Sequence, residues 1–258
     1  MNRIDKKKVN QHFSRAAADY DEHARLQREI ADELLARIDE AGINPTRILD
    51  LGTGTGFMAV DLARKFKSSE VMGCDIAEGM LSVAQRKIKK DGLFNLSFKK
   101  CDAEKLPFSD ESFDLVVSNA SFQWMDPERT FSEIKRVLVP NGSLFFTTFG
   151  PRTLKELREA DSSSVHDFPD SQKLTTILAN LRLVDVKIDE QLVRGKFSDV
   201  KSLLYSLKNI GAQYSSGASG GLGGKQRLQQ IIQNYPSPAM ATFEIIFGRA
   251  RKSALSNH

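Results

Sequence analysis

The segment with the clearest chemical potential has three glycines at alternate positions, preceded by an acid. The sequence Asp50-Leu51-Gly52-Thr53-Gly54-Thr55-Gly56 directly follows an apolar pair, residues 48–49. Such a turn lets a ligand approach bare backbone, and the helical pattern that follows offers free N–H groups and a positive dipole end. The third glycine comes one position too early for the dinucleotide pattern G-x-G-x-x-G. The acid favours a cationic, nucleotide-like ligand; a purely structural turn is the alternative.

Acidic and amide side chains also follow the next predicted strands. Asp75 ends the apolar run 71–74, 19 positions after the last glycine, where a carboxylate can accept both hydroxyls of a ribose. Asp102 follows residues 96–101 and can accept an adenine amino group, with the Ala103 N–H beside it. Because ligands of open α/β sheets bind beyond the carboxyl ends of strands, these residues should share one site. The expected nucleoside contacts are Asp75, Ile76, Met80, Asp102 and Ala103, and Asn119 at the end of the fourth strand is a further expected contact of the same ligand.

Aromatic and amide groups follow the fourth predicted strand, residues 113–119, and they suit a substrate pocket. Gln123 and Trp124 lie in this turn, and Trp124 is the only tryptophan. The alternative for Trp124 is a core anchor for helix 126–138. Tyr20 and Gln27 belong to the N-terminal helical stretch, which can fold over the glycine turn; a half-buried tyrosine and a surface amide are the alternatives.

The elements that must position these residues alternate between strand and helix through residue 149, which predicts a parallel sheet. Residues 9–40 are predicted to be helical. Later strands at 183–194 and 239–250 complete a seven-stranded α/β sheet with helices on both faces and an antiparallel edge. We expect one domain, with cap helices at 1–44, a ligand-binding core at 45–150, and a helical lid from 151–182 and 195–235. The glycine-rich run 215–224 is predicted to be a mobile loop.

Composition limits the remaining possibilities. The 258 residues are 40% hydrophobic, with no apolar run long enough to span a bilayer. Cys74 and Cys101 are predicted to be free core thiols, which favours a reduced, cytoplasmic setting. The four histidines have no ligand spacing, so no metal is expected. The net charge of +4 comes from the part after residue 150, which can attract an acidic partner or be a solvated face.

The glycine turn with its acid resembles motif I of the Rossmann-like S-adenosylmethionine-dependent methyltransferases. Four further stretches resemble the malonyl-acyl-carrier-protein O-methyltransferases of biotin synthesis: 13–27, 118–124, 146–149 and 206–212. The resemblance implies S-adenosylmethionine as the cofactor and malonyl-acyl-carrier protein, an acidic protein, as the substrate. The cofactor contacts that it implies in addition to the nucleoside contacts above are Tyr20, Gln27, Asp50, Gly52, Thr53, Gly54 and Gly56.

The reaction implied by the resemblance is methylation of the free malonyl carboxylate. A carboxylate is ionised at neutral pH, so it needs positioning donors rather than a general base. We expect Tyr20 near the transferred methyl group, and Lys208 and Arg152 as candidates to hold the carboxylate; for each cation the alternative is a solvated surface charge. We expect a monomer without nucleic-acid or membrane partners. Two rival functions remain: a methyltransferase for a small acid or quinone precursor, and a nucleic-acid-binding module.

Overall fold

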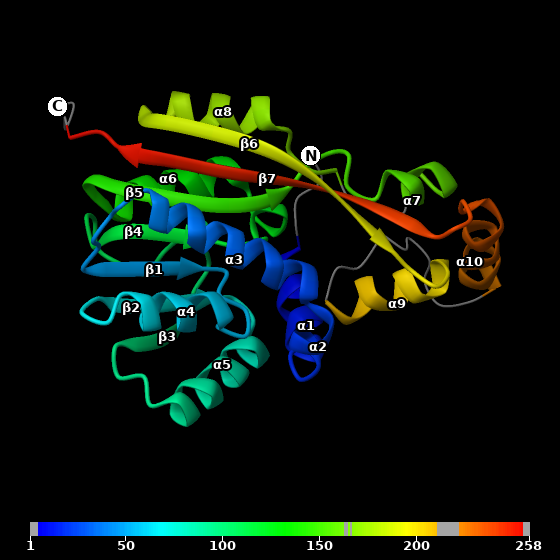
Figure 1. Cartoon of the computed structure of the whole chain (residues 1–258), viewed down its shortest axis with the longest axis horizontal. Coiled ribbons are helices and arrows are strands. Elements are labelled where there is room, and N and C mark those ends of the chain that lie inside the picture. The colour runs from blue at the N-terminus through cyan, green and yellow to red at the C-terminus, as the bar shows by residue number, and fades with distance from the viewer. Residues whose placement is uncertain (1–4, 163–164, 166, 211–221, 255–258) are drawn as a thin grey trace.

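The chain forms a seven-stranded sheet in the order β3-β2-β1-β4-β5-β7-β6 (Figure 1). The computed structural model describes residues 5–162, 165, 167–210 and 222–254. The strands are β1 Arg47–Leu51, β2 Glu70–Asp75, β3 Leu96–Lys100, β4 Phe113–Ser118, β5 Leu138–Phe149, β6 Leu183–Lys196 and β7 Met240–Lys252. The helices of the core are α3 Arg25–Glu40, α4 Phe57–Lys65, α5 Glu78–Asp91, α6 Pro127–Val137 and α8 Ser171–Asn180, with the short η1 Phe122–Trp124 after β4.

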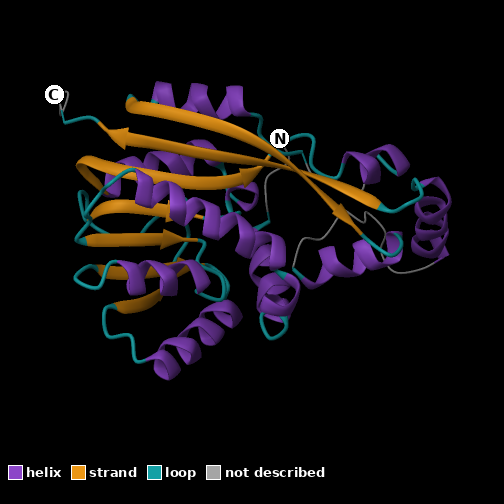
Figure 2. Cartoon of the chain, in the orientation of Figure 1, coloured by secondary structure: helices purple, strands orange, loops and turns teal. Residues whose placement is uncertain are grey.

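Helices cover both faces of the sheet because its central strands are apolar on both sides. Leu115 and Val117 of β4 pack into the cluster that includes α3 and α4, whereas Val116 packs into the cluster that includes α6 and α8. This alternation follows from the two-residue period of a strand, and it explains why the strand is a nearly continuous apolar run. Figure 2 shows the resulting helix–sheet–helix layers.

Strands β1 to β5 are parallel, and the reversed strand is the second from the edge. β7 pairs antiparallel with β5 on one side and with β6 on the other. The predicted seven-stranded α/β sheet is therefore confirmed, with β6 as the outermost strand. The long alternating pattern of β6 suits this edge, because one of its faces remains open to solvent.

The N-terminal region is not the single helix predicted for residues 9–40. It forms α1 Lys6–Ala16, α2 Tyr20–His23 and α3 Arg25–Glu40. Asp19, at the N-cap of α2, lies outside helical geometry, with φ −107° and ψ 2°. α1 contacts α5, α2 contacts α9, and α3 packs on β5 and α4. Hydrophobic periodicity alone did not locate the breaks between them. We call α1 and α2 the cap.

The C-terminal helical insertion lies at the far end of a long β6–β7 ribbon. Figure 1 shows α7 Lys155–Ala160, α9 Val200–Asn209 and α10 Leu222–Asn234 gathered there, away from the parallel part of the sheet. Leu203, Leu204 and Leu207 are buried residues of α9. The predicted mobile loop lies outside the described residues as far as residue 221; residues 222–224 begin α10.

Candidate functional site

A pocket opens at the carboxyl ends of β1 to β4, where the sequence places its acids and glycines. This glycine-turn pocket has a volume of about 90 Å³. Most of the predicted contacts line it, and they are Tyr20, Gly52, Gly54, Asp75, Ile76, Met80, Asp102, Ala103 and Asn119. Gln27, Asp50, Thr53 and Gly56 do not line it. Because parallel strands end at one edge of the sheet, residues far apart in sequence meet there.

The three glycines of the turn have different roles. All three have positive φ, between 55° and 81°, which favours glycine over other residues. A Cβ on Gly52 would approach the Ser121 side chain to 2.6 Å, and one on Gly56 would approach Ala84 to 2.9 Å. A Cβ on Gly54 would meet nothing within 4 Å. Gly54 is thus the glycine that borders open space in the pocket, whereas the outer two permit close packing.

Asp75 is fixed by the backbone on both sides. Its Oδ2 accepts a hydrogen bond from the Gly54 N–H at 2.8 Å, and its Oδ1 accepts one from the Ala77 N–H at 2.8 Å. Desolvation raises the pKa of this carboxyl, while the backbone donors oppose the shift. Each oxygen has lone pairs left, so a ribose-like pair of hydroxyls has acceptors here.

Asp50 lies beneath the turn rather than in the pocket wall. It is 1% exposed, and the Thr53 hydroxyl donates to its Oδ2 at 2.5 Å. Burial raises the pKa of Asp50 to about 7, and the nearby charge of Asp75 contributes to this rise. The hydrogen bond from Thr53 has the opposite effect and lowers the pKa. The hydrogen bond between Asp50 and Thr53 therefore stabilises the conformation of the turn, and neither residue lines the pocket.

The two cysteines are not free thiols. Cys74 and Cys101 are joined as a disulfide with a Cα–Cα distance of 5.8 Å, so the sequence prediction is wrong. Cys74 lies in β2 and Cys101 directly follows β3, its neighbour in the sheet. Their separation of 27 residues hides this proximity, which only strand order reveals.

The cap is attached over the glycine-turn pocket at three points. Lys6 of α1 donates to both oxygens of Asp102 at 2.9 and 2.7 Å and contacts Glu104 at 2.6 Å. Asp21 of α2 accepts from the Thr55 hydroxyl at 2.5 Å and pairs with Lys87 of α5. Between these points, the Gly79 N–H donates to the Ser14 hydroxyl at 3.2 Å. Sequence reasoning missed these contacts, since each joins segments with no common periodicity.

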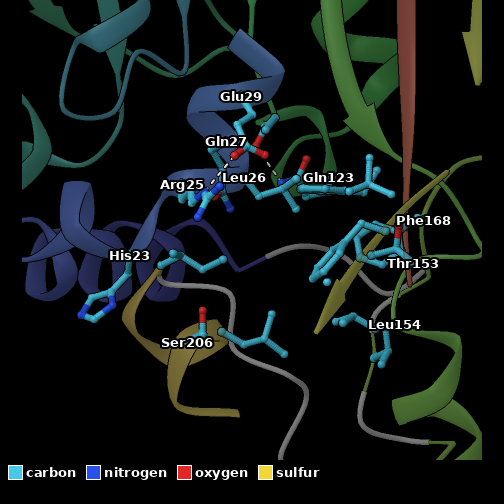
Figure 3. A pocket seen from close by; sticks show the side chains of 18 of the residues that line it. His23, Arg25, Leu26, Gln27, Glu29, Gln123, Thr153, Leu154, Phe168 and Ser206 are labelled. Carbon is cyan, nitrogen blue, oxygen red and sulfur yellow. Dashed lines mark hydrogen bonds and ion pairs between the residues drawn. The ribbon is translucent and has the colours of Figure 1, made fainter. Parts of the chain in front are cut away.

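A second, larger cavity of about 460 Å³ adjoins the pocket, and its wall draws on α2, α3, η1, the 149–168 segment, β6 and α9 (Figure 3). We call it the large cavity. Four residues line both spaces, and they are Phe13, Tyr20, Ala120 and Trp124. Trp124 packs edge-on against Phe13, with ring centroids 5.5 Å apart. The predicted substrate-pocket residues Gln123 and Trp124 thus both lie in the cavity wall.

Tyr20 lies where the two spaces meet. Burial raises the pKa of its phenol, and the charges of Asp75 and Asp21 raise it further. The hydroxyl is therefore protonated at neutral pH and can donate a hydrogen bond. This arrangement suits a ligand in the glycine-turn pocket reacting with a second molecule in the large cavity.

Gln27 and Asn119 connect α3 to the ends of β4 and β5. The Asn119 side chain donates to the Gln27 backbone carbonyl at 3.0 Å, and its Oδ1 accepts from the Thr147 hydroxyl at 2.7 Å. That hydroxyl also accepts from the Ala120 N–H at 2.8 Å. Gln27 lines the large cavity, although the sequence suggests it as a cofactor contact.

The two cations proposed for the substrate carboxylate lie elsewhere. Lys208 is exposed on α9, together with Lys201 and Tyr205, and none of the three lines the large cavity. Arg152 is exposed and pairs with Glu244 at 2.5 Å and Glu190 at 2.7 Å. The Glu244 bond raises the pKa of its guanidinium. Their predicted roles remain predictions.

The described residues contain no group of three or more histidine, cysteine or acidic side chains able to hold a metal ion. Across the same residues, no helix is long and apolar enough to cross a membrane.

Comparison with known proteins shows both domain-level and full-length similarity. Residues 49–146 match the family model described as a methyltransferase domain. The chain is 36% identical to a malonyl-[acyl-carrier protein] O-methyltransferase of Gallionella capsiferriformans, over 97% of this chain and 92% of that protein. It is 33% identical to the protein of the same name from Geobacter sulfurreducens, over 96% of this chain and 100% of that one.

Solved structures share the fold at lower sequence identity. The YcgJ protein of Bacillus subtilis aligns with a TM-score of 0.65 and 19% identity, covering 85% of this chain and 97% of its own. A phosphoethanolamine N-methyltransferase of Haemonchus contortus, solved with S-adenosyl-L-methionine, aligns with a TM-score of 0.57 and 24% identity, covering 86% of this chain and 52% of its own. At these identities the likeness concerns the fold.

Proposed function

The chain belongs to the malonyl-[acyl-carrier protein] O-methyltransferases, and from that membership we propose that it methylates the free carboxylate of malonyl-acyl-carrier protein, an early step of biotin biosynthesis. The observation that carries the proposal is the full-length similarity, which extends through the cap and the C-terminal insertion. These regions build the large cavity, whereas the methyltransferase-domain match covers only residues 49–146.

The residues of the glycine-turn pocket fit S-adenosylmethionine. Asp75 offers carboxylate lone pairs to the ribose, and the open space at Gly54 lets a ligand approach the backbone. Asp102 and Met80 line the side assigned to adenine. When bound, this cofactor supplies an electrophilic methyl group on a positively charged sulfur.

The chain's own residues bind, orient and exclude water. Tyr20 keeps its proton and presents a donor where the pocket and the large cavity meet. A general base is unnecessary because a carboxylate, with a reference pKa near 4, is already ionised at neutral pH. Catalysis then depends on holding one carboxylate oxygen in line with the methyl group and removing its water.

The carrier protein is the expected macromolecular partner, since the family acts on its malonyl thioester. The exposed α9 flank of Lys201, Tyr205 and Lys208 lies beside the cavity wall formed by Ser206, Leu207 and Ile210. Exposed cations in this position suit an acidic partner whose flexible arm enters the cavity. The monomeric state and the lack of nucleic-acid or membrane partners stay predictions.

Mass spectrometry of malonyl-carrier protein incubated with enzyme and S-adenosylmethionine tests the proposal. We expect a gain of one methylene unit, located on the malonyl group. Acetyl-carrier protein, which lacks the free carboxylate, serves as the control and should not gain mass. Methylation of a free small acid with no preference for the carrier-bound substrate would instead support the rival small-acid function.

A further inference from the structure

We propose that the side-chain amide of Gln27 holds the methyl-accepting carboxylate, so that this anion is oriented by a neutral donor rather than by Lys or Arg. The inference rests on the proposed function, because it concerns the acidic substrate of that reaction. It reassigns Gln27 from the cofactor, where the sequence suggests it, to the substrate.

Gln27 is held rigidly in the wall of the large cavity. It is the third residue of α3 and is 6% exposed. Its backbone carbonyl accepts from Asn119 at 3.0 Å, and Thr147 holds Asn119 in turn. Those bonds involve only the Gln27 main chain, so they leave the side-chain amide free to meet a ligand.

The amide of Gln27 has no partner within the described part of the chain. Its Oε1 is buried and unbonded, and no side-chain hydrogen bond of Gln27 is present there. A buried amide without partners is costly, so such groups are normally satisfied. Gln123, in the same wall, shows the usual case: its Nε2 donates to the Ala120 carbonyl at 2.7 Å. Rotation about the terminal torsion of Gln27 can turn its donor end toward a carboxylate.

The cations of the cavity wall are placed at its periphery. Arg25 is 89% exposed at its side chain and pairs with Glu29 at 2.8 Å. Arg194 and Lys196 are exposed residues of β6. Like Val193, which pairs with Phe243 of β7, both contribute to the cavity wall, but both remain exposed to solvent.

Apart from Tyr20, and from Glu29 as the partner of Arg25, the remaining ionisable group of the described wall is His23. Its ring contacts Asn209 at 3.1 Å and packs edge-on against Tyr205, both of α9. His23 therefore joins the cap to the insertion. Tyr20 and Trp124 are the neutral donors that line both spaces. Of the two side-chain amides in the described wall, Gln123 is already bonded, which leaves that of Gln27.

Neutral donors suit this reaction because it removes charge. A carboxylate oxygen forms a bond to the methyl carbon as the carbon–sulfur bond breaks, which gives a neutral ester and a neutral thioether with no proton transferred. A cation bound to the carboxylate stabilises the anionic ground state more than the transition state, and so raises the barrier. A neutral amide also orients the oxygen, but it stabilises the anionic ground state less than a cation does, so it raises the barrier less.

The test compares two ligands that differ in one negative charge and one methyl group: malonyl-carrier protein and its methyl ester. Their dissociation constants are measured with S-adenosylhomocysteine present, for wild type, Gln27→Met and Gln27→Arg. Gln123→Met is the matched control, because it removes an amide of the same size that is already bonded. Affinity for S-adenosylhomocysteine alone, the unfolding midpoint, kcat and KM complete the set.

We expect Gln27→Met to weaken malonyl binding about tenfold or more, the scale of a hydrogen bond to a charged group, and to change ester and S-adenosylhomocysteine binding less than about twofold. Gln27→Arg should bind malonyl-carrier protein more tightly yet turn over more slowly. Gln123→Met should affect both carrier ligands equally.

Three outcomes overturn the assignment. Equal loss of malonyl and ester binding in Gln27→Met makes Gln27 a packing residue. Parallel loss of S-adenosylhomocysteine affinity makes it a cofactor contact. An unchanged or faster kcat in Gln27→Arg contradicts the argument for a neutral donor. Failure of wild type to methylate the malonyl group counts against the proposed function itself.

Discussion

At the scale of single residues, the three glycines of the turn carry different constraints. Gly54 borders open space in the glycine-turn pocket, whereas Gly52 faces the Ser121 side chain. Both have positive φ, so any side chain costs about 1–2 kcal/mol of backbone strain.

We predict that Gly54→Val leaves the protein folded but loses most cofactor affinity, since its side chain takes ligand space. Calorimetry with S-adenosylhomocysteine and urea unfolding measure the two effects separately. Gly52→Ala is the comparison: its Cβ clash at 2.6 Å should lower the free energy of unfolding by more than the strain alone. A folded Gly54→Val enzyme with normal affinity would refute the assignment.

The buried carboxyl of Asp50 predicts a pH dependence of stability. Its pKa is about 7 in the folded chain and 3.8 as a reference, so the folded state binds the proton more tightly. This contribution is fully present below about pH 4 and is lost as the pH rises through about 7. Urea unfolding from pH 4 to pH 8 should show wild type losing stability relative to Asp50→Asn across this window. Identical pH profiles for the two proteins would show that Asp50 does not retain its proton.

At the scale of elements, the packing of α1 on α5 depends on the absence of a side chain at Gly79. A Cβ there would lie 2.6 Å from the backbone oxygen of Ser14. Replacing glycine by alanine inside a helix normally stabilises it by about 1 kcal/mol. Here the clash involves backbone, which cannot rotate away, so α1 must move as a unit.

We predict that Gly79→Ala releases the cap while the core stays folded. Because α1 contributes Lys6, Val9 and Phe13 to the glycine-turn pocket, cofactor affinity should fall and proteolysis within residues 5–16 should increase. Ser82→Ala, an exposed change on α5 whose hydroxyl bonds only to its own helix, is the control. If Gly79→Ala shows control-like proteolysis and affinity, α1 does not need this close approach.

At the scale of the whole molecule, charge is unevenly placed, and this should affect carrier binding. We predict that the KM for malonyl-carrier protein rises steeply with salt, because the Debye length falls from about 10 Å at 0.1 M to about 3 Å at 1 M. Affinity for S-adenosylmethionine, held largely within the pocket, should change much less. Steady-state kinetics and calorimetry across this salt range measure both.

Charge reversal locates the docking surface. Lys201→Glu with Lys208→Glu should raise the carrier KM and spare turnover of a small malonyl thioester. Lys89→Glu with Lys90→Glu, exposed on α5 far from α9 in Figure 1, makes the same charge change and should have little effect. If both malonyl substrates lose activity together, Lys208 instead holds the carboxylate. If neither pair matters, the basic excess is only a solvated face.

Local sequence patterns were enough to predict the sheet, the glycine turn and the acids at the strand ends. Each of these predictions uses only residues that are close together in the sequence. An apolar run indicates a strand such as β4, and the residue that follows it lies at the edge of the sheet where the parallel strands have their carboxyl ends. Asp75, Asp102 and Asn119 therefore reach one pocket without any knowledge of long-range packing.

Contacts between distant segments become visible only in the folded chain. The contact of Lys6 with Asp102 spans 96 residues, and the pairing of Cys74 with Cys101 depends on the adjacency of β2 and β3. The same holds for Gln27, because no sequence pattern shows that its buried Oε1 has no hydrogen-bond partner among the described residues. Periodicity reports which face of an element is buried, but not what covers that face, because packing between separate segments leaves no repeat in either one.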